Sequence, residues 1–209
     1  MRADQQQRAR ISRRGRPPQS DGPALDRARL VATLLHMARS GGIEALNIRP
    51  VAQRLGVSPR LLYHHVRDKE AMLALLTDEI LRGRMPDLSA PDWESRLRSI
   101  ARAVHMAYRD FPGSAAFILS RSANRLDLPN ALAIRRAIFA ALAEAGLTQE
   151  QSEEMLVIFS VIVLGNIVVA ESLDDNDDRL AMQRNVVEAA LTRATDMLLT
   201  AVRAIAGAV

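Results

Sequence analysis

Gly56 separates two short helical patterns, and this arrangement constrains the fold more than any other feature of the sequence. Asn47 can cap a helix over residues 48–55, and Ser58 can cap a second helix that has Pro59 at its first position. A turn of three or four residues joins the two, which is the geometry of a helix-turn-helix unit. The second helix of such a unit can enter the major groove of DNA with its N-terminus first.

The rest of the chain also shows helical periodicity. Of the 209 residues, 48% are hydrophobic and only 3% aromatic. Ala, Leu, Arg, Met and Glu, which are good helix formers, are common, and alternating strand-like runs are scarce. The patterns predict an all-α protein with helices at about residues 26–40, 48–55, 59–65, 69–82, 92–109, 114–123, 129–145, 149–172 and 180–206.

Charge and helix breakers divide the chain into parts. Residues 1–22 are polar and Arg-rich and are expected to be disordered in isolation. Residues 23–84 are predicted to form a DNA-binding domain and residues 85–209 a second helical domain. Residues 1–84 carry 16 basic and 8 acidic side chains, whereas the remainder carries 12 and 16. A basic N-terminal part predicts a polyanionic partner, although basic tails are common and often bind nothing specific.

Several classes of protein and site are disfavoured. The chain has no cysteine, which excludes disulfides and thiolate metal sites. No apolar segment follows the basic N-terminus, and the longest apolar run, at about residues 155–170, is shorter than the roughly 20 residues that cross a bilayer. We therefore expect a soluble cytoplasmic protein.

The sequence also contains no catalytic, cofactor-binding or metal-binding motif. Phosphate-binding loops, dinucleotide fingerprints and nucleophile elbows are missing, so an enzyme is not expected and no cofactor is predicted. The acidic run at residues 174–178 lacks the glycine and the closing glutamate of a calcium loop. We interpret it as a solvated loop.

Residues 13–18 read RRGRPP and resemble an AT-hook. Arg14 and Arg16 would supply positive charge to the narrow minor groove of A·T-rich DNA, and Pro17 would hold the chain extended. Upstream of a helix-turn-helix unit, such an arm could enter the adjacent minor groove. The alternative is a nonspecific basic tail that adds only salt-dependent affinity.

Residues 46–73 read LNIRPVAQRLGVSPRLLYHHVRDKEAML and resemble the signature of the TetR family of bacterial transcriptional repressors. The resemblance extends upstream through ARLVATLLHMARSGGIEAL and covers about residues 25–80. The C-terminal part resembles, more loosely, the ligand-binding and dimerisation domain of the branch near the tetracycline repressor. The resemblance implies a helical DNA-binding domain followed by a helical effector-binding domain.

The resemblance also implies roles for particular residues. Asn47 stands where members usually carry Thr, capping the helix and reaching a phosphate, and Leu61 stands where Ser or Thr is frequent. Arg60 occupies a position from which side chains reach base edges, and Lys69 a position that binds phosphate beside free helix N–H groups. The predicted DNA contacts are Arg14, Arg16, Asn47, Arg49, Ser58, Pro59, Arg60, Leu61, Tyr63, His64 and Lys69.

Two alternatives stay open for these residues. Tyr63 could be packing rather than a DNA contact. His64 and His65 could be a metal pair, although adjacent positions on a helix diverge by about 100° and no third ligand follows at metal-site spacing.

The last two helices predict a homodimer. The helix at residues 149–172 is apolar nearly all round in its middle and must be covered on more than one side. The helix at residues 180–206 has apolar side chains at three- and four-residue steps: Val187, Leu191, Ala194, Leu198, Val202 and Ile205. Two such helices from each subunit can form a four-helix bundle. The alternative is that both helices complete a monomeric core.

The resemblance implies that a small organic effector enters the C-terminal domain and releases the DNA. The predicted apolar lining is Leu97, Ile100, Val104, Leu132, Phe139 and Ile162. The predicted effector-binding residues are His65, His105, Phe139, Ser160 and Asn166. Asn166 and Ser160 could equally make internal hydrogen bonds, because buried polar groups need partners.

The sequence therefore predicts a sequence-specific transcriptional regulator, an effector-released repressor that binds a palindromic operator as a homodimer. The alternative is an architectural DNA-binding protein with little sequence preference.

Overall fold

The computed structural model describes residues 25–121, 128–173 and 181–207, and within these ranges the chain forms helices and loops but no strand. The predicted all-α fold is confirmed. The elements in order are α1 (Arg27–Gly41), a short 3-10 helix η1 (Ile43–Ala45), α2 (Ile48–Leu55), α3 (Pro59–Tyr63), α4 (Lys69–Arg82), α5 (Trp93–Tyr108), α6 (Ser114–Leu119), α7 (Pro129–Glu144), α8 (Gln149–Glu171) and α9 (Ala181–Ala206).

Three helices of the N-terminal half begin at residues whose side chains cap them, including Ser58 as predicted. The Asp26 carboxylate accepts a hydrogen bond from the backbone N–H of Arg29 (2.7 Å). Ser58 and Asp68 cap α3 and α4 in the same way. Each cap satisfies an N–H group that a helix terminus leaves without a partner.

The predicted cap of α2 is correct in position, but the predicted capping bond is absent. Asn47 occupies the N-cap position, but its side chain makes no capping hydrogen bond. Its amide oxygen instead accepts a hydrogen bond from Lys69 Nζ (2.9 Å). α3 is also shorter than expected, ending at Tyr63, because the N–H of His65 bonds the carbonyl of Leu62 in a tight turn.

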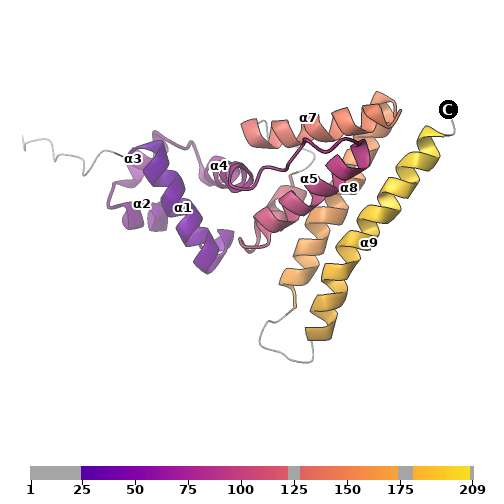
Figure 1. Ribbon diagram of the computed structural model, residues 1–209. Helices are drawn as coiled ribbons and strands as arrows, with labels where there is room; N and C mark the ends of the chain where they lie inside the picture. Colours follow the sequence, from indigo (N-terminus) through magenta and orange to yellow (C-terminus); the bar gives the residue numbers. More distant parts are fainter. Residues whose placement is uncertain (1–24, 122–127, 174–180, 208–209) are drawn as a thin grey trace, which may run out of the picture.

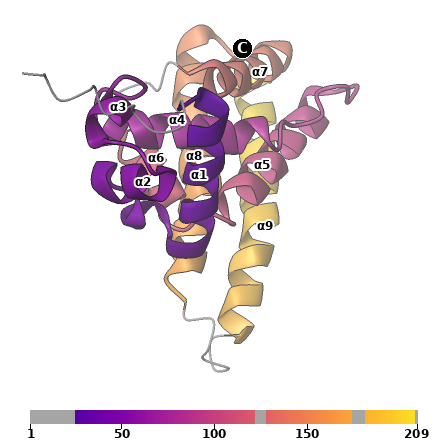
Figure 2. The ribbon, with the colours of Figure 1, turned by 90° about the vertical axis from the view of Figure 1, so that its left-hand side faces the viewer.

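Helices α1–α3 form one end of the molecule and α5, α7, α8 and α9 the other, with α4 between them (Figure 1). α4 packs against α1 on one side and against α5 and α7 on the other. Figure 2 shows α1, α2 and α3 facing the viewer on the side away from α9. Fully buried leucines fill the space between α1, α2, α3 and α4: Leu30, Leu34, Leu55, Leu62 and Leu76. The predicted boundary after residue 84 therefore falls just beyond the helix that joins the two ends.

A backbone contact also connects the two ends. The N–H of Ile43 donates to the carbonyl of Pro112 (2.9 Å), in the corner between α5 and α6. Gly42 has a positive φ of 68°, and a Cβ there would lie 3.1 Å from the same carbonyl. A side chain at residue 42 would be strained and would push the ends apart.

α8 lies at the centre of the C-terminal half and packs against α5, α6, α7 and α9. Phe159, Val163 and Ile167 are buried on it. Among the described helices, α8 is long and apolar enough to cross a membrane by length and composition alone, a property that core helices share. The predicted apolar seam of α9 faces inward, since Leu198 and Val202 are buried within the subunit.

Candidate DNA-binding surface and ligand cavity

α3 exposes one face and buries the other. Leu62 is fully buried and Leu61 is half-buried against the core, whereas Arg60 and His64 face solvent. Tyr63 exposes 53% of its surface. A half-exposed aromatic side chain contributes little to a core, and this disfavours the packing alternative for Tyr63.

Several contacts fix α3 relative to α2. Gly56 ends α2 in the left-handed conformation, with a φ of 67°, and the N–H of Val57 donates to the carbonyl of Ala52 (3.0 Å). Ala52 is buried where the helices meet. From α1, the Arg29 guanidinium donates to the carbonyl of Leu55 (2.7 Å) at the end of α2. The exposed face of α3 is therefore presented by a rigid support.

The N-terminal ends of α2 and α4 meet through Asn47 and Lys69. The Lys69 amine donates to the Asn47 amide oxygen, and both side chains, like Arg49, are exposed. Because the Asn47 side chain does not cap α2, the first N–H groups of that helix stay open to a ligand. Helix N-termini and cations attract phosphate together, so this cluster suits a DNA backbone.

The predicted DNA contacts come from three adjoining segments: the start of α2, α3 and the start of α4. We call their exposed members the α3 surface, which consists of Asn47, Arg49, Ser58, Pro59, Arg60, Tyr63, His64 and Lys69. Arg14 and Arg16 lie outside the described residues. Within the described residues, no group of three metal-binding side chains includes His64 or His65.

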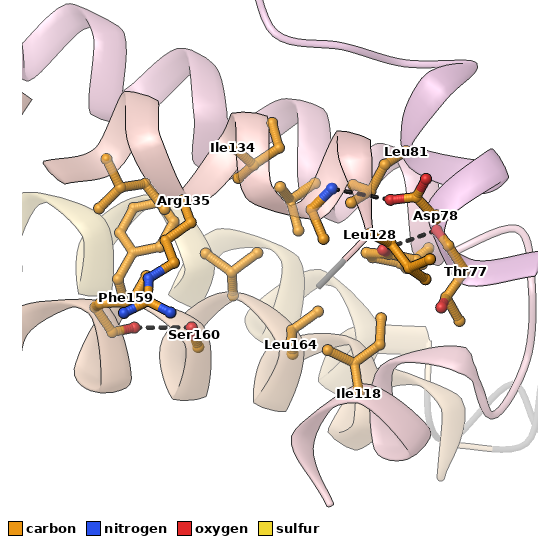
Figure 3. A pocket seen from close by; sticks show the side chains of 16 residues that line it. Thr77, Asp78, Leu81, Ile118, Leu128, Ile134, Arg135, Phe159, Ser160 and Leu164 are labelled. Carbon is orange, nitrogen blue, oxygen red and sulfur yellow. Dashed lines mark hydrogen bonds between the residues drawn. The ribbon is translucent and has the colours of Figure 1, made fainter. Parts of the chain in front are cut away.

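A cavity of about 150 Å³ lies between α4, α5, α7 and α8 (Figure 3). A cavity of this size can hold a molecule as small as benzene. Its lining is Thr77, Asp78, Leu81, Val104, Tyr108, Ile118, Leu128, Ala131, Ile134, Arg135, Ile138, Leu156, Phe159, Ser160, Val163 and Leu164.

At one end of the cavity the polar groups satisfy one another. The buried Asp78 carboxylate accepts hydrogen bonds from the N–H groups of Asn130 (3.0 Å) and Ala131 (2.9 Å) and from the Asn130 amide (2.7 Å). The Tyr108 hydroxyl donates to the carbonyl of Thr77 (3.1 Å). Burial, together with the nearby Asp78, raises the pKa of Tyr108 above its usual range, so the hydroxyl stays protonated.

The Phe159 side of the cavity, unlike the Asp78 end, holds a cationic side chain, Arg135 (Figure 3). Arg135 reaches it from α7, half-buried, and its guanidinium lies 5.3 Å from the centre of the Phe139 ring. Ser160 donates a hydrogen bond to the carbonyl of Leu156 (2.7 Å). Among the described residues, no carboxylate forms an ion pair with Arg135.

The structure does not bring the five predicted effector residues together. Ser160 lines the cavity, and Phe139 lies beneath Arg135 without lining it. His105 and Asn166 bond each other outside the cavity, and His65 is exposed beside α3. Of the predicted apolar lining, only Val104 contributes, because the other five side chains lie outside the 150 Å³ cavity.

His105 and Asn166 form a polar link between α5, α8 and α9. The Asn166 amide donates to the carbonyl of Val187 (2.6 Å), so its oxygen is the acceptor for His105 Nε2 (3.1 Å). Burial lowers the pKa of His105 despite the bond to Asn166, with Arg109 lowering it and Glu188 raising it. A second cavity of about 330 Å³ lies beside His105, lined also by Arg109, Glu171 and Glu188.

Sequence reasoning missed Asp78, Tyr108 and Arg135. A sequence signal existed for Asp78, because it lies among Leu75, Leu76 and Leu81 in an apolar stretch of the predicted helix at residues 69–82. No local pattern distinguishes Arg135 from its neighbour in the Arg-Arg pair of α7.

Comparisons with known proteins bear on both ends of the molecule. Residues 30–76 match the family model described as bacterial regulatory proteins, tetR family. An HTH-type transcriptional regulator of Saccharopolyspora erythraea is 29% identical over 175 residues, covering 83% of this chain and 72% of that protein. The class D tetracycline repressor protein of Escherichia coli is 38% identical over 93 residues, covering 41% of this chain and 42% of the repressor. The latter match is N-terminal and leaves the resemblance of the C-terminal part to that branch a prediction.

The fold extends the likeness beyond the N-terminal domain. The crystal structure of Mycobacterium smegmatis BioQ superposes with a TM-score of 0.74 at 21% identity, covering 86% of this chain and 99% of BioQ. At that identity the agreement concerns the fold. With the helix-turn-helix geometry, the family match and the relatives taken together, residues 30–76 form the N-terminal domain of the tetR family of bacterial regulatory proteins.

Proposed function

We propose that this protein is a homodimeric transcriptional repressor that binds a palindromic DNA operator through the α3 surface and releases it when a small organic molecule binds the C-terminal domain. The observation that carries the proposal is the α2–turn–α3 unit, in which a buried Ala52 and Leu62 support an exposed α3. The names of the relatives, a transcriptional regulator and a tetracycline repressor, support the same function.

The residues of the α3 surface divide by their chemistry. Arg60, exposed near the start of α3, suits hydrogen bonding to base edges in the major groove. Asn47, Arg49 and Lys69 suit phosphate, because they gather at two helix N-termini. Leu61, half-buried on the same helix, offers apolar contact to a thymine methyl group.

Exposed apolar side chains on α8 and α9 support the homodimer. Six of them are more than half exposed: Val157, Val161, Val169, Met182, Val186 and Met197. Those of α9 lie four and eleven residues apart, close to whole numbers of helical turns, so they form a stripe opposite the buried seam. Contiguous exposed apolar surface marks interaction sites, and a second subunit with the same stripe would complete a four-helix bundle.

The cavity beneath α4 supports effector release. It borders Thr77 and Asp78 on the helix whose first residue is the candidate phosphate ligand Lys69. A ligand that fits the cavity better in the conformation that does not bind DNA would shift the population away from the operator. A regulator of this kind works in the bacterial cytoplasm, where the DNA is.

Selection of binding sites from a random DNA pool tests the proposal. We expect a palindromic sequence bound at least about a thousandfold more tightly than random DNA, as specific dimeric regulators bind. Equal, strongly salt-dependent binding to all sequences would refute sequence-specific repression and favour an architectural protein. Titration of the selected site at two salt concentrations separates the two outcomes.

A further inference from the structure

We propose that the effector is a small organic acid whose carboxylate pairs with Arg135 and whose apolar part fills the cavity between α4, α5, α7 and α8. The proposal rests on the proposed function, because it names the ligand class for the regulated site. The polar groups at the Asp78 end of the cavity already have hydrogen-bond partners, whereas Arg135 has no anionic partner among the described residues.

Arg135 is the group that lacks an anionic partner among the described residues. A guanidinium has five N–H donors and no acceptor, and a half-buried cation is costly to leave without an opposite charge. The Phe139 ring, whose centre lies 5.3 Å from the guanidinium carbon, offers a cation–π attraction but no hydrogen-bond acceptor. A guanidinium can bind a carboxylate in bidentate fashion through two of its N–H groups.

Ser160 can add a second hydrogen bond at the same place. Figure 3 shows Arg135 and Ser160 on the Phe159 side of the cavity. The Ser160 hydroxyl now donates to the carbonyl of Leu156, a bond within one helix that rotation of the hydroxyl can exchange for a ligand oxygen. A carboxylate between the two would accept from both.

The opposite end of the cavity rejects an anion. The Asp78 carboxylate lies there, with its oxygens held by Asn130 and Ala131, and a second negative charge beside it would be repelled. The Tyr108 hydroxyl is occupied by the carbonyl of Thr77. The acid group of the ligand must therefore lie at Arg135, with hydrocarbon pointing toward Asp78.

Size limits the apolar part. The cavity of about 150 Å³ has room for one aromatic ring or a short acyl chain, and its lining includes Ile134, Ile138 and Leu164. These side chains offer dispersion contacts and no hydrogen bonds. We therefore expect monocyclic aryl acids or short-chain fatty acids rather than polar or large molecules.

Calorimetric titration of the full chain tests the ligand class with four probes: phenylacetic acid, hexanoic acid and the neutral amides of both. We expect each acid to bind at least about tenfold more tightly than its amide, because charge-assisted hydrogen bonds are the stronger ones. Arg135→Gln should abolish the difference, and Arg135→Lys should keep much of it. Arg136→Gln, which changes the exposed neighbour on the same helix, should leave it intact.

Three results would overturn the proposal: equal binding of acids and amides, no detectable binding of either acid at millimolar concentration, or an acid preference that survives Arg135→Gln in a protein that unfolds at the normal temperature. Operator binding is measured separately by fluorescence anisotropy with the selected DNA. Acid binding that requires Arg135 but releases no operator would keep the ligand class and refute effector release. Specific operator binding without any acid preference would keep the DNA-binding function and refute the ligand class.

Discussion

The carboxylate of Asp78 accepts hydrogen bonds from the backbone and the side chain of Asn130, and so ties α4 to the first turn of α7 at one end of the cavity. α4 begins at Lys69 in the α3 surface and passes the cavity at Asp78. A ligand that separates α7 from α4 must strain or break these hydrogen bonds. Because Asp78 and Lys69 lie on the same helix, a displacement of α4 at the cavity would also move the candidate phosphate ligand Lys69.

Replacing Asp78 tests that link. Asp78→Ala should lower the free energy of unfolding by about 3 kcal/mol, because it removes three hydrogen bonds to a buried carboxylate and leaves the donors of α7 without a partner. Urea denaturation measures the change. Asp110→Ala, at an exposed carboxylate paired with Arg84, should cost less than about 1 kcal/mol. Equal losses would contradict a special role for Asp78.

Lys69 is expected to bind phosphate. Lys69→Ala should weaken binding to operator and random DNA by the same factor and reduce the slope of log K against log salt by about one. Anisotropy titrations at several salt concentrations measure both quantities. Arg102→Ala removes an exposed charge on α5, outside the α3 surface. It should change neither the DNA affinity nor the salt slope. A loss confined to the operator would assign Lys69 to base recognition instead.

Arg60 is expected to read a base. Arg60→Ala should cost about 1–3 kcal/mol on the operator, much less on random DNA, and should relax the sequence preference at one position of each half-site. Repeating the selection with the variant reveals that position. An unchanged selected sequence, or equal losses on both DNAs, would remove Arg60 from base recognition.

His105 should make stability depend on pH. Burial lowers its pKa in the folded protein below the ordinary value of about 6.5, so the stabilising neutral form is fully populated above that pH and is lost as the pH falls through the lower, folded-state pKa. Urea denaturation at pH 7.5 and pH 5 should show a loss of stability that is smaller in His105→Gln. Identical pH profiles for the two proteins would contradict the assignment.

The exposed stripe of α9 should hold the dimer together. Met197→Glu should convert the protein to monomers and abolish tight operator binding, because it places a charge in an apolar interface. Sedimentation velocity measures the mass, and circular dichroism checks that the helices persist. Met106→Glu makes the same change at an exposed methionine of α5 and should leave a dimer. A dimeric Met197→Glu variant would place the interface elsewhere.

The starts of the helices were predictable from sequence because their signals are local. Asp26, Ser58 and Asp68 each cap a helix three residues before the N–H that they bind. The cap at Asn47 was not predictable in the same way, because its competing partner, Lys69, is 22 residues away and reaches it only after α2 and α4 have packed.

The cavity was less predictable for the same physical reason. Its lining comes from five helices, and the bond from Asn130 to Asp78 spans 52 residues. Periodicity identifies which face of a helix is buried but not which neighbour covers it. Asn166 and His105 were therefore recognised as polar groups in an apolar setting, while their pairing with each other emerged only from the packing of α5 against α8.

Lys69, which contacts Asn47 in the α3 surface, can serve as a chemical reporter of DNA binding. Lys69 is the sole lysine among the 209 residues, since every other basic side chain that carries a permanent charge is arginine. Amine-selective reagents such as acetylating agents therefore have one side-chain target, and it is exposed at the start of α4. The rate of acetylation at this residue would report DNA occupancy directly, by protection, in an otherwise unaltered chain.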